Sequence, residues 1–162
     1  MEFPASSPSP RTPAPQPTPE FDWEERLIAE ARRASERAYC PYSRFAVGAA
    51  VLTEAGTIHV GCNVENASYG LTICAERAAL ARAVVEHGGP GAVPSIVAVA
   101  VYTPTDQPTP PCGACRQVIF EFGPRTRVLA AGLGFQRIRT TIDQLLPGAF
   151  GPSTLSGGEE VT

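Results

Sequence analysis

Two short segments of this 162-residue chain constrain its fold more than any other part, because together they carry three cysteines and a glutamate at fixed spacing. The first segment is Cys74-Ala75-Glu76-Arg77, and the second is Pro111-Cys112-Gly113-Ala114-Cys115-Arg116. Three thiolates can hold a tetrahedral zinc ion and leave its fourth position to water, which is the arrangement of catalytic zinc sites. If all three cysteines bind one ion, the fold must bring the two segments together.

Glu76 lies two residues after Cys74, near enough to reach a water at the open position without being a ligand itself. A carboxylate in that place can take a proton from the water and deliver protons to the reacting group. A ligand, one residue and a glutamate, followed later by Pro-Cys-x-x-Cys, resembles the signature of zinc deaminases. We therefore predict that Glu76 is the acid and base of a hydrolytic deamination.

The charge of such a site needs an offset, since three thiolates on Zn²⁺ leave a net charge of about −1. Cys74 and Cys112 each stand at the start of a predicted helix, where the helix dipole favours a thiolate. Arg77 lies three residues after Cys74, and Arg116 directly follows Cys115. We expect both guanidinium groups to draw charge from the sulfurs, which helps to restore the acidity of the water.

The overall charge and composition narrow the functional classes. The formal net charge is −3, and all thirteen cationic side chains are arginines because the chain has no lysine, which disfavours polynucleotide binding. Residues 1–20 lack the apolar run of a signal peptide and the cysteines number five, which together favour a reducing cytoplasm. We also expect no membrane span, since the sequence has no apolar stretch of about eighteen residues.

Composition also suggests the domain boundaries. Prolines alternate with small polar residues over 1–20, which predicts a disordered tail or, as an alternative, a docking peptide for a partner's aromatic groove. Residues 21–152 are expected to form one catalytic domain, which is long enough to bury a core. Residues 153–162 are polar and are expected to form a flexible C-terminal tail.

Helices and strands are predicted to alternate along this domain. A capping box at Asp22 and Glu25 opens the first helix, and Pro41 ends it. Helices are also expected over 74–87 and 112–122, with a helical turn at 142–146. Strands are expected over 44–52, 57–62, 95–102, 126–131 and 137–142. The alternation predicts an α/β/α sandwich on a mostly parallel or mixed sheet.

Two of these segments are expected at the centre of the fold. Residues 95–102 are apolar on both faces, as in a strand that is covered on two sides. The helix over 74–87 is apolar on most of its surface and is therefore predicted to be central. Gly48, Ala49 and Ala50 indicate that another element packs closely against the 44–52 strand.

Five ordered blocks of sequence resemble the small homotetrameric zinc-dependent cytidine deaminases. They are YCPYSRFAVGAA (39–50), GCNVENASYG (61–70), ICAER (73–77), PPCGACRQV (110–118) and LLPGAFGP (145–152). The resemblance spans roughly Trp23 to Pro152, and the five blocks together are far more specific than Cys-x-x-Cys alone. The resemblance implies a three-layer α/β/α sandwich around a mixed five-stranded sheet, with one zinc ion per subunit of a homotetramer.

The resemblance also implies an activity, which is hydrolytic deamination of cytidine and 2'-deoxycytidine to uridine and 2'-deoxyuridine in pyrimidine salvage, with release of ammonia. Cys74, Cys112 and Cys115 match the zinc ligands of the family, and Glu76 matches its acid and base. Phe45 would pack on the pyrimidine, and the backbone of Ala75 would help to recognise the base. Asn63 and Glu65 would bind the ribose hydroxyls. Each pocket would be completed from neighbouring subunits by Ala67, Tyr69 and Phe150.

Local chemistry favours a nucleoside over a nucleotide. A carboxylate at Glu65 can accept a hydrogen bond from a sugar hydroxyl but repels a nearby phosphate. No glycine-rich loop of the phosphate-binding kind is present either. Contact with the 3'-hydroxyl would admit both cytidine and deoxycytidine.

Other interpretations stay open from the residues alone. The three cysteines could form a structural zinc site completed by Cys40, Cys62 or a histidine, or could be ordinary buried thiols. The chain could act on another aminated pyrimidine or a cytosine-containing antibiotic, or be a zinc-stabilised binding module without catalysis. For the other residues the simplest interpretations are structural. Cys40 and Cys62 would be buried thiols, His59 and His87 would bind no metal, and Asn63 and Glu65 would only form turns. Phe45 would belong to the core, Tyr69 and Phe150 would pack within their own subunit, and Arg77 would lie on the surface. Gly132–Arg139 receives no role.

Overall fold

The computed structural model describes residues 19–87 and 91–155. Most of both predicted tails and the Gly88-Gly89 pair that was expected to stop a helix therefore lie outside the described residues. The helical elements are α1 (Pro19–Ser35), η1 (Tyr69–Leu71), α2 (Ala75–His87), α3 (Gly113–Phe122), α4 (Ile142–Leu145) and α5 (Pro152–Leu155). The strands are β1 (Gly48–Thr53), β2 (Ile58–Cys62), β3 (Ile96–Tyr102), β4 (Arg127–Ala131) and β5 (Arg137–Thr141).

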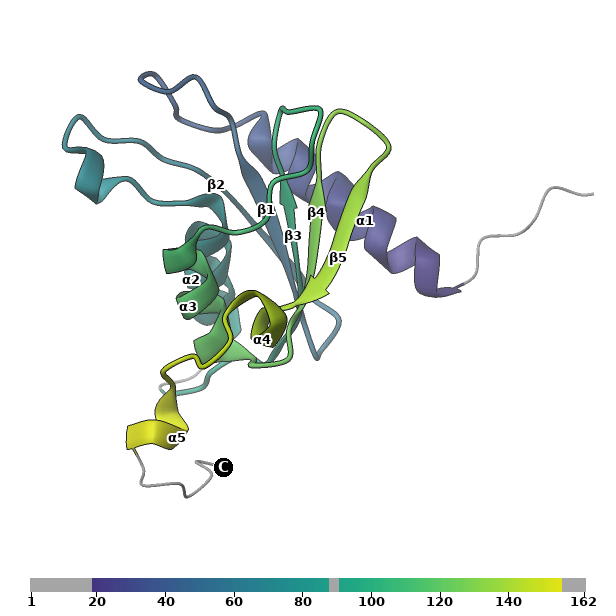
Figure 1. Cartoon of the computed structure of the whole chain (residues 1–162), viewed down its shortest axis with the longest axis vertical. Helices are drawn as coiled ribbons and strands as arrows, with labels where there is room; N and C mark the ends of the chain where they lie inside the picture. Colours follow the sequence, from purple (N-terminus) through teal and green to yellow (C-terminus); the bar gives the residue numbers. More distant parts are fainter. Residues whose placement is uncertain (1–18, 88–90, 156–162) are drawn as a thin grey trace, which may run out of the picture.

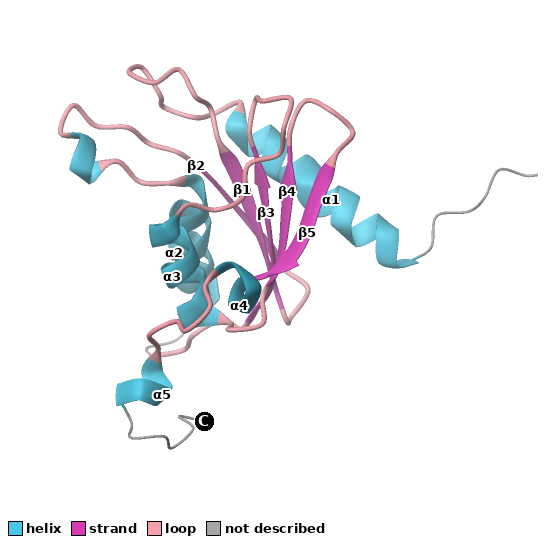
Figure 2. Cartoon of the chain, in the orientation of Figure 1, coloured by secondary structure: helices cyan, strands magenta, loops and turns pink. Residues whose placement is uncertain are grey.

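The five strands form one mixed sheet in the order β2-β1-β3-β4-β5. Strands β3 and β4 are parallel, and every other neighbouring pair is antiparallel. Helix α1 covers one face of the sheet, and α2 and α3 cover the other (Figure 1, Figure 2). The predicted three-layer α/β/α sandwich around a mixed five-stranded sheet is confirmed.

Each face of the sheet has its own apolar cluster. Ala49 and Val51 of β1 face α2 and α3, whereas Ala50 between them faces α1. This alternation is what a strand covered on both sides requires. Strand β3 is the middle strand and is buried along its length except at Val97, as its continuous apolar sequence predicts.

Two glycines allow the helices to lie unusually close to the sheet. A Cβ on Gly48 would lie 1.9 Å from the Ala31 carbonyl oxygen of α1, which confirms the predicted close packing against this strand. A Cβ on Gly61 of β2 would lie 2.4 Å from the Ala79 nitrogen and 2.6 Å from the Ala75 oxygen of α2. The first turn of α2 therefore rests directly on the backbone of β2.

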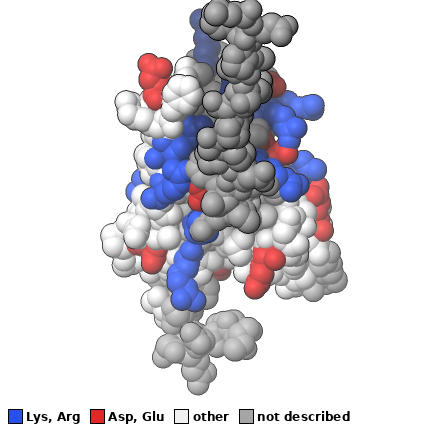
Figure 3. All heavy atoms as spheres, turned by 90° about the vertical axis from the view of Figure 1, so that its right-hand side faces the viewer, with Lys and Arg blue, Asp and Glu red and all other residues white. Residues whose placement is uncertain are grey.

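Ion pairs attach the beginning of α1 to strands β4 and β5. The buried Glu24 accepts hydrogen bonds from Arg127 Nη2 on β4 at 3.1 Å and from Arg139 Nε on β5 at 2.7 Å. The Arg127 guanidinium also lies 4.6 Å from the ring centre of Trp23. Arginine and acidic side chains are interspersed on the side of the molecule shown in Figure 3. These contacts hold α1 in place at its first turns.

Some predicted boundaries were wrong for reasons that the structure makes clear. Helix α1 begins at Pro19 rather than Asp22 and ends at Ser35, well before Pro41. Beyond it, Tyr39 forms an isolated bridge with Val64, which draws the chain out of the helix. The strand expected from Arg44 begins only at Gly48, because the backbone before it turns and bonds to the Asn63 side chain.

Helix α2 packs against β1 and β2 and also contacts α3, which agrees with the prediction of a central helix, but its apolar surface is not fully covered. Ala75, Ala79, Leu80 and Ala83 are buried, whereas Val85 is 82% exposed. No helix within 19–87 or 91–155 combines the length and apolar character needed to cross a membrane.

Candidate metal centre and active site

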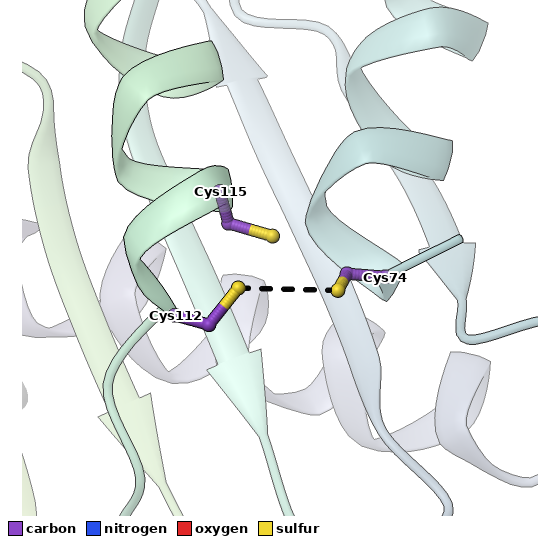
Figure 4. Close-up of side chains that lie close together, drawn as sticks. All are labelled: Cys74, Cys112 and Cys115. Carbon is purple, nitrogen blue, oxygen red and sulfur yellow. Dashed lines mark hydrogen bonds between the residues drawn. The ribbon is translucent and has the colours of Figure 1, made fainter. Parts of the chain in front are cut away.

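The three cysteines that the sequence singled out converge between two helix N-termini. Cys74 immediately precedes α2, Cys112 is the N-cap of α3, and Cys115 lies in the first turn of α3 (Figure 4). Their Sγ atoms all lie within 4.8 Å of one another, and those of Cys74 and Cys112 are 4.0 Å apart. With Zn–S bonds of about 2.3 Å, a tetrahedral site needs sulfurs about 3.8 Å apart. The cluster therefore fits one zinc ion.

The other cysteines and the histidines lie elsewhere. Within the described residues, the metal-ligand cluster contains Cys74, Cys112 and Cys115 and no fourth cysteine, histidine or carboxylate. Cys62 is half-buried and donates to the Arg37 carbonyl, and Cys40 is half-buried rather than fully buried as predicted. His59 is buried on β2 with its Nδ1 2.8 Å from a Glu86 carboxylate oxygen. Three ligands without a protein-derived fourth are typical of catalytic zinc.

The electrostatics of the cluster favour ionisation of Cys74 first. The hydrogen bond with the Cys115 thiol has the largest effect and lowers the pKa of Cys74. Burial raises this pKa, the Arg77 guanidinium lowers it again, and the net result is a pKa of about 5. The pKa of Cys115 is raised, mainly because it bonds to the Cys74 sulfur and is buried. Without a cation, one thiolate thus discourages the next, and a bound metal ion removes this opposition.

Glu76 is a buried carboxyl group in the first turn of α2. Its side chain is only 4% exposed, and it lines the same cavity as Cys74 and Cys112. Burial raises its pKa, and the negative charge on Cys74 raises it further. A carboxyl group whose charged form is disfavoured by its surroundings is suited to accept and release protons near neutral pH.

A cavity of about 410 Å³ opens in front of these groups. It is lined by the predicted residues Phe45, Asn63, Glu65 and Ala75, and also by Glu76, Cys74 and Cys112. The rest of the lining was not predicted from the sequence and consists of Ser43, Val47, Thr72, Val101, Thr103, Thr109 and Pro110. The Pro-rich loop before Cys112 was the available signal for Thr109 and Pro110, because any loop that delivers a ligand must border the site.

Asn63 and Glu65 hold the loop that carries Phe45. The Asn63 side chain accepts a hydrogen bond from the Val47 nitrogen at 2.8 Å and donates one to the Phe45 oxygen at 2.9 Å. Glu65 Oε2 accepts from the nitrogens of Tyr42 and Ser43 at 2.9 and 3.2 Å. The local interpretation as turn formers was therefore too narrow, because both side chains bind a segment about twenty residues away.

The two candidate charge-dispersing arginines make different contacts. Arg77 Nη2 donates to the Thr72 oxygen at 3.0 Å and lies 3.6 Å from the Cys74 sulfur, as predicted for a group beside the thiolate. Arg116 instead donates to the carbonyl oxygens of Pro111 and Leu145 at 2.7 and 3.0 Å. It connects the loop before Cys112 to α4, and its role toward the sulfurs stays a prediction.

Three predicted substrate residues lie outside this chain's own cavity. Ala67 is exposed, Tyr69 in η1 is 73% exposed, and Phe150 is 57% exposed. The Tyr69 ring contacts Tyr42, with ring centres 5.8 Å apart, and the Phe150 oxygen accepts a hydrogen bond from Gln117. A single chain therefore does not bring these side chains to the metal centre.

The fold and the three-cysteine centre define a zinc-dependent deaminase. The chain belongs to the family described as the cytidine and deoxycytidylate deaminase zinc-binding region, whose model matches residues 21–131. It is similar to the cytidine deaminase of Sporosarcina psychrophila, with 49% identity over 84% of this chain and 97% of that protein. It is also similar to the cytidine deaminase of Halalkalibacterium halodurans, with 50% identity over 78% of this chain and 92% of that one.

Solved structures agree with this assignment. The crystal structure of cytidine deaminase from Burkholderia pseudomallei is 47% identical, with a TM-score of 0.72 over 78% of this chain and 98% of that chain. That of cytidine deaminase from Mycobacterium tuberculosis is 42% identical, with a TM-score of 0.66 over 80% of this chain and 98% of that chain. The chain thus matches these relatives over nearly their whole length.

Proposed function

We propose that this chain deaminates cytidine and 2'-deoxycytidine by hydrolysis, giving uridine or 2'-deoxyuridine and ammonia in pyrimidine salvage. The observation that carries the proposal is the buried Glu76 carboxyl group, which faces one cavity together with the converging cysteines. The similarity to relatives named cytidine deaminase supports the choice of substrate.

Cys74, Cys112 and Cys115 would hold the zinc ion, which supplies Lewis acidity that makes a water molecule a nucleophile near neutral pH. Glu76 would take one proton from that water. It would pass this proton to the ring nitrogen as hydroxide adds to the neighbouring carbon. It would then carry the proton of the added hydroxyl group to the departing amino group, so that ammonia leaves and a carbonyl remains. One carboxyl group thereby serves as base and acid in the same turnover.

The cavity residues would orient the nucleoside for this chemistry. Phe45 offers an aromatic face for the pyrimidine, and Ala75 offers backbone groups at the start of α2. Glu65 Oε2 accepts two backbone hydrogen bonds, and the carboxylate has further lone pairs that would accept from a ribose hydroxyl. Asn63 keeps one N–H free for the same purpose after bonding to the Phe45 oxygen.

A carboxylate at the sugar end favours a nucleoside over a nucleotide, because it repels a phosphate. A panel of cytidine, deoxycytidine, cytosine and cytidine monophosphate, followed by the loss of ultraviolet absorbance, tests both activity and specificity. We expect turnover of the two nucleosides and little of the other two compounds. Equal activity on cytidine monophosphate would contradict the role of Glu65, and no turnover at all would leave a binding module.

We further propose a homotetramer in which Ala67, Tyr69 and Phe150 complete the pockets of neighbouring subunits. All three are exposed and none of them lines this chain's own cavity, which supports the idea. Mixing two inactive variants provides the test. Glu76→Gln supplies an intact Phe150, and Phe150→Ala supplies an intact Glu76, so mixed assemblies should contain complete pockets and regain activity. Light scattering should give four chain masses, and mixed assemblies without activity would refute shared pockets.

A reducing compartment such as the cytoplasm suits this site, because the five cysteines are free and three are needed as thiolates. Fractionation of the source cells would test this location.

A further inference from the structure

Arg44 has an unusual backbone conformation at the rim of the cavity. Its φ angle is 55°, and it is the one non-glycine residue with positive φ among residues 19–87 and 91–155. Its two neighbours, Ser43 and Phe45, both line the cavity. Non-glycine residues occupy this left-handed region at a cost, and they remain there only where surrounding contacts enforce it.

Hydrogen bonds before the turn fix one side of it. The nitrogens of Tyr42 and Ser43 both donate to Glu65 Oε2, at 2.9 and 3.2 Å. The Arg44 nitrogen donates to the Cys40 oxygen at 3.0 Å. The chain therefore enters the turn in a defined position.

Hydrogen bonds at and after the turn fix the other side. The Phe45 nitrogen donates to Ser43 Oγ at 3.0 Å, directly across Arg44. The Phe45 oxygen then accepts from Asn63 Nδ2 at 2.9 Å, and the Val47 nitrogen donates to Asn63 Oδ1 at 2.8 Å. Asn63 and Glu65 belong to one short segment, so a single element holds both sides of the reversal.

The side chain of Arg44 has no comparable part in this arrangement. It is exposed, and its guanidinium makes no hydrogen bond or ion pair with any other residue in the described ranges. The feature that matters is thus the backbone conformation and not the charge. An extended residue at this position would direct the chain away from the turn and separate the Glu65 contacts from the Asn63 contacts.

We propose that Arg44 is a positioning residue whose left-handed backbone places Phe45 against the pyrimidine. The inference rests on the proposed function, in which Phe45 packs on the base. Because none of the hydrogen bonds of this turn involves Glu76 or the three clustered cysteines, its disruption affects nucleoside binding more than the chemical step.

Two substitutions at this position separate backbone from charge. Arg44→Val introduces a β-branched residue, which avoids the left-handed region, whereas glycine in Arg44→Gly adopts it freely. We expect Arg44→Val to raise the KM for cytidine at least about fivefold, with a smaller change in kcat and an unchanged zinc content. Arg44→Gly should keep KM near that of the parent, although it too lacks the guanidinium. Arg125→Val serves as the control, since Arg125 is an exposed arginine in a turn without positive φ.

Several results would overturn the inference. One is a parental KM in a folded Arg44→Val. Another is an Arg44→Gly KM raised as far as that of Arg44→Val while Arg44→Lys stays normal, which would assign the effect to charge. If the valine variant does not fold, Arg44→Gly must still unfold at a higher temperature than Arg44→Ala, because positive φ is unfavourable for alanine. Equal midpoints would also refute it. Failure of the proposed function is distinct, because it would appear as absent cytidine turnover in the parent.

Discussion

Two buried glutamates, one in each helical layer, have surroundings that fit a structural role on one face of the sheet and the proposed catalytic role on the other. Glu24 in α1 is 6% exposed and Glu76 in α2 is 4% exposed. Glu24 is committed to ion pairs with Arg127 and Arg139, which join α1 to β4 and β5. Within the described ranges, no arginine donates a hydrogen bond to Glu76, which faces thiols and the cavity instead. Burial alone therefore does not distinguish the two carboxyl groups, whereas the hydrogen bonds from arginines to Glu24 do.

The largest effect should come from Glu76→Gln. The amide keeps the size of the side chain but cannot carry the proton, so kcat should fall by at least about 10²–10⁴-fold. The zinc content should remain at one ion per chain and the unfolding temperature should not fall, because a buried charge has been removed. Ultraviolet assays, metal analysis and thermal unfolding measure the three quantities. Retained turnover would refute the proposed role of Glu76 as acid and base.

The next effect concerns the metal ligands of the α2 and α3 layer. Cys112→Ser should lose zinc and activity together, with a larger drop in metal affinity than the roughly 10–100-fold typical of an outer partner. Cys62→Ser is the matched control, because Cys62 is also a free thiol but lies outside the cluster. Metal analysis after dialysis compares the two variants. Full zinc retention in Cys112→Ser would show that the cluster is not the metal site.

Substitutions of Arg77 and Arg116 should have different effects, one on the metal centre and the other on stability, like the two glutamates. Arg77→Gln removes a donor beside the Cys74 sulfur and should lower zinc affinity by about 10–100-fold. Arg116→Gln removes two hydrogen bonds to carbonyl oxygens and should mainly lower the free energy of unfolding, by about 1–3 kcal/mol. Chelator competition and denaturant unfolding distinguish these outcomes. Unchanged zinc affinity and kcat in Arg77→Gln would refute its role at the thiolate.

The smallest effect should come from Glu24→Gln on the opposite face. It weakens the contacts of α1 with Arg127 and Arg139, and we expect the free energy of unfolding to fall by about 1–2 kcal/mol. The kcat should not change, since the catalytic cavity lies in front of the other layer. Denaturant unfolding and the cytidine assay test the two halves of this expectation. A loss of kcat without a loss of stability would contradict the division of labour.

The ligand set and the order of the layers could be predicted because they depend on spacing and periodicity. Cys74 and Cys112 had to stand at helix starts, and β3 had to be covered on both faces. The start of β1 could not be predicted, since the Asn63 side chain and the turn at Arg44 override the apolar pattern of the residues before Gly48. A tertiary hydrogen bond of this kind leaves no local signal.

The same limit applies to single side chains. Arg116 stands next to Cys115 in the sequence, yet it points to the carbonyl of Leu145, because adjacency along a helix does not set the direction of a side chain. Thr103 reaches the cavity only because β3 ends there. No residue pattern around it announces that position.

The near contact between Gly61 and α2 has a consequence for how this enzyme can change over time. Gly61 lies outside the cluster of three cysteines and does not line the cavity, yet any side chain there would meet the backbone of Ala75 and Ala79. Relief of that clash would move the first turn of α2, and with it the placement of Cys74 and Glu76 relative to α3. Lineages of this chain should therefore accept new residues at exposed sites such as Val85 long before they accept one at Gly61.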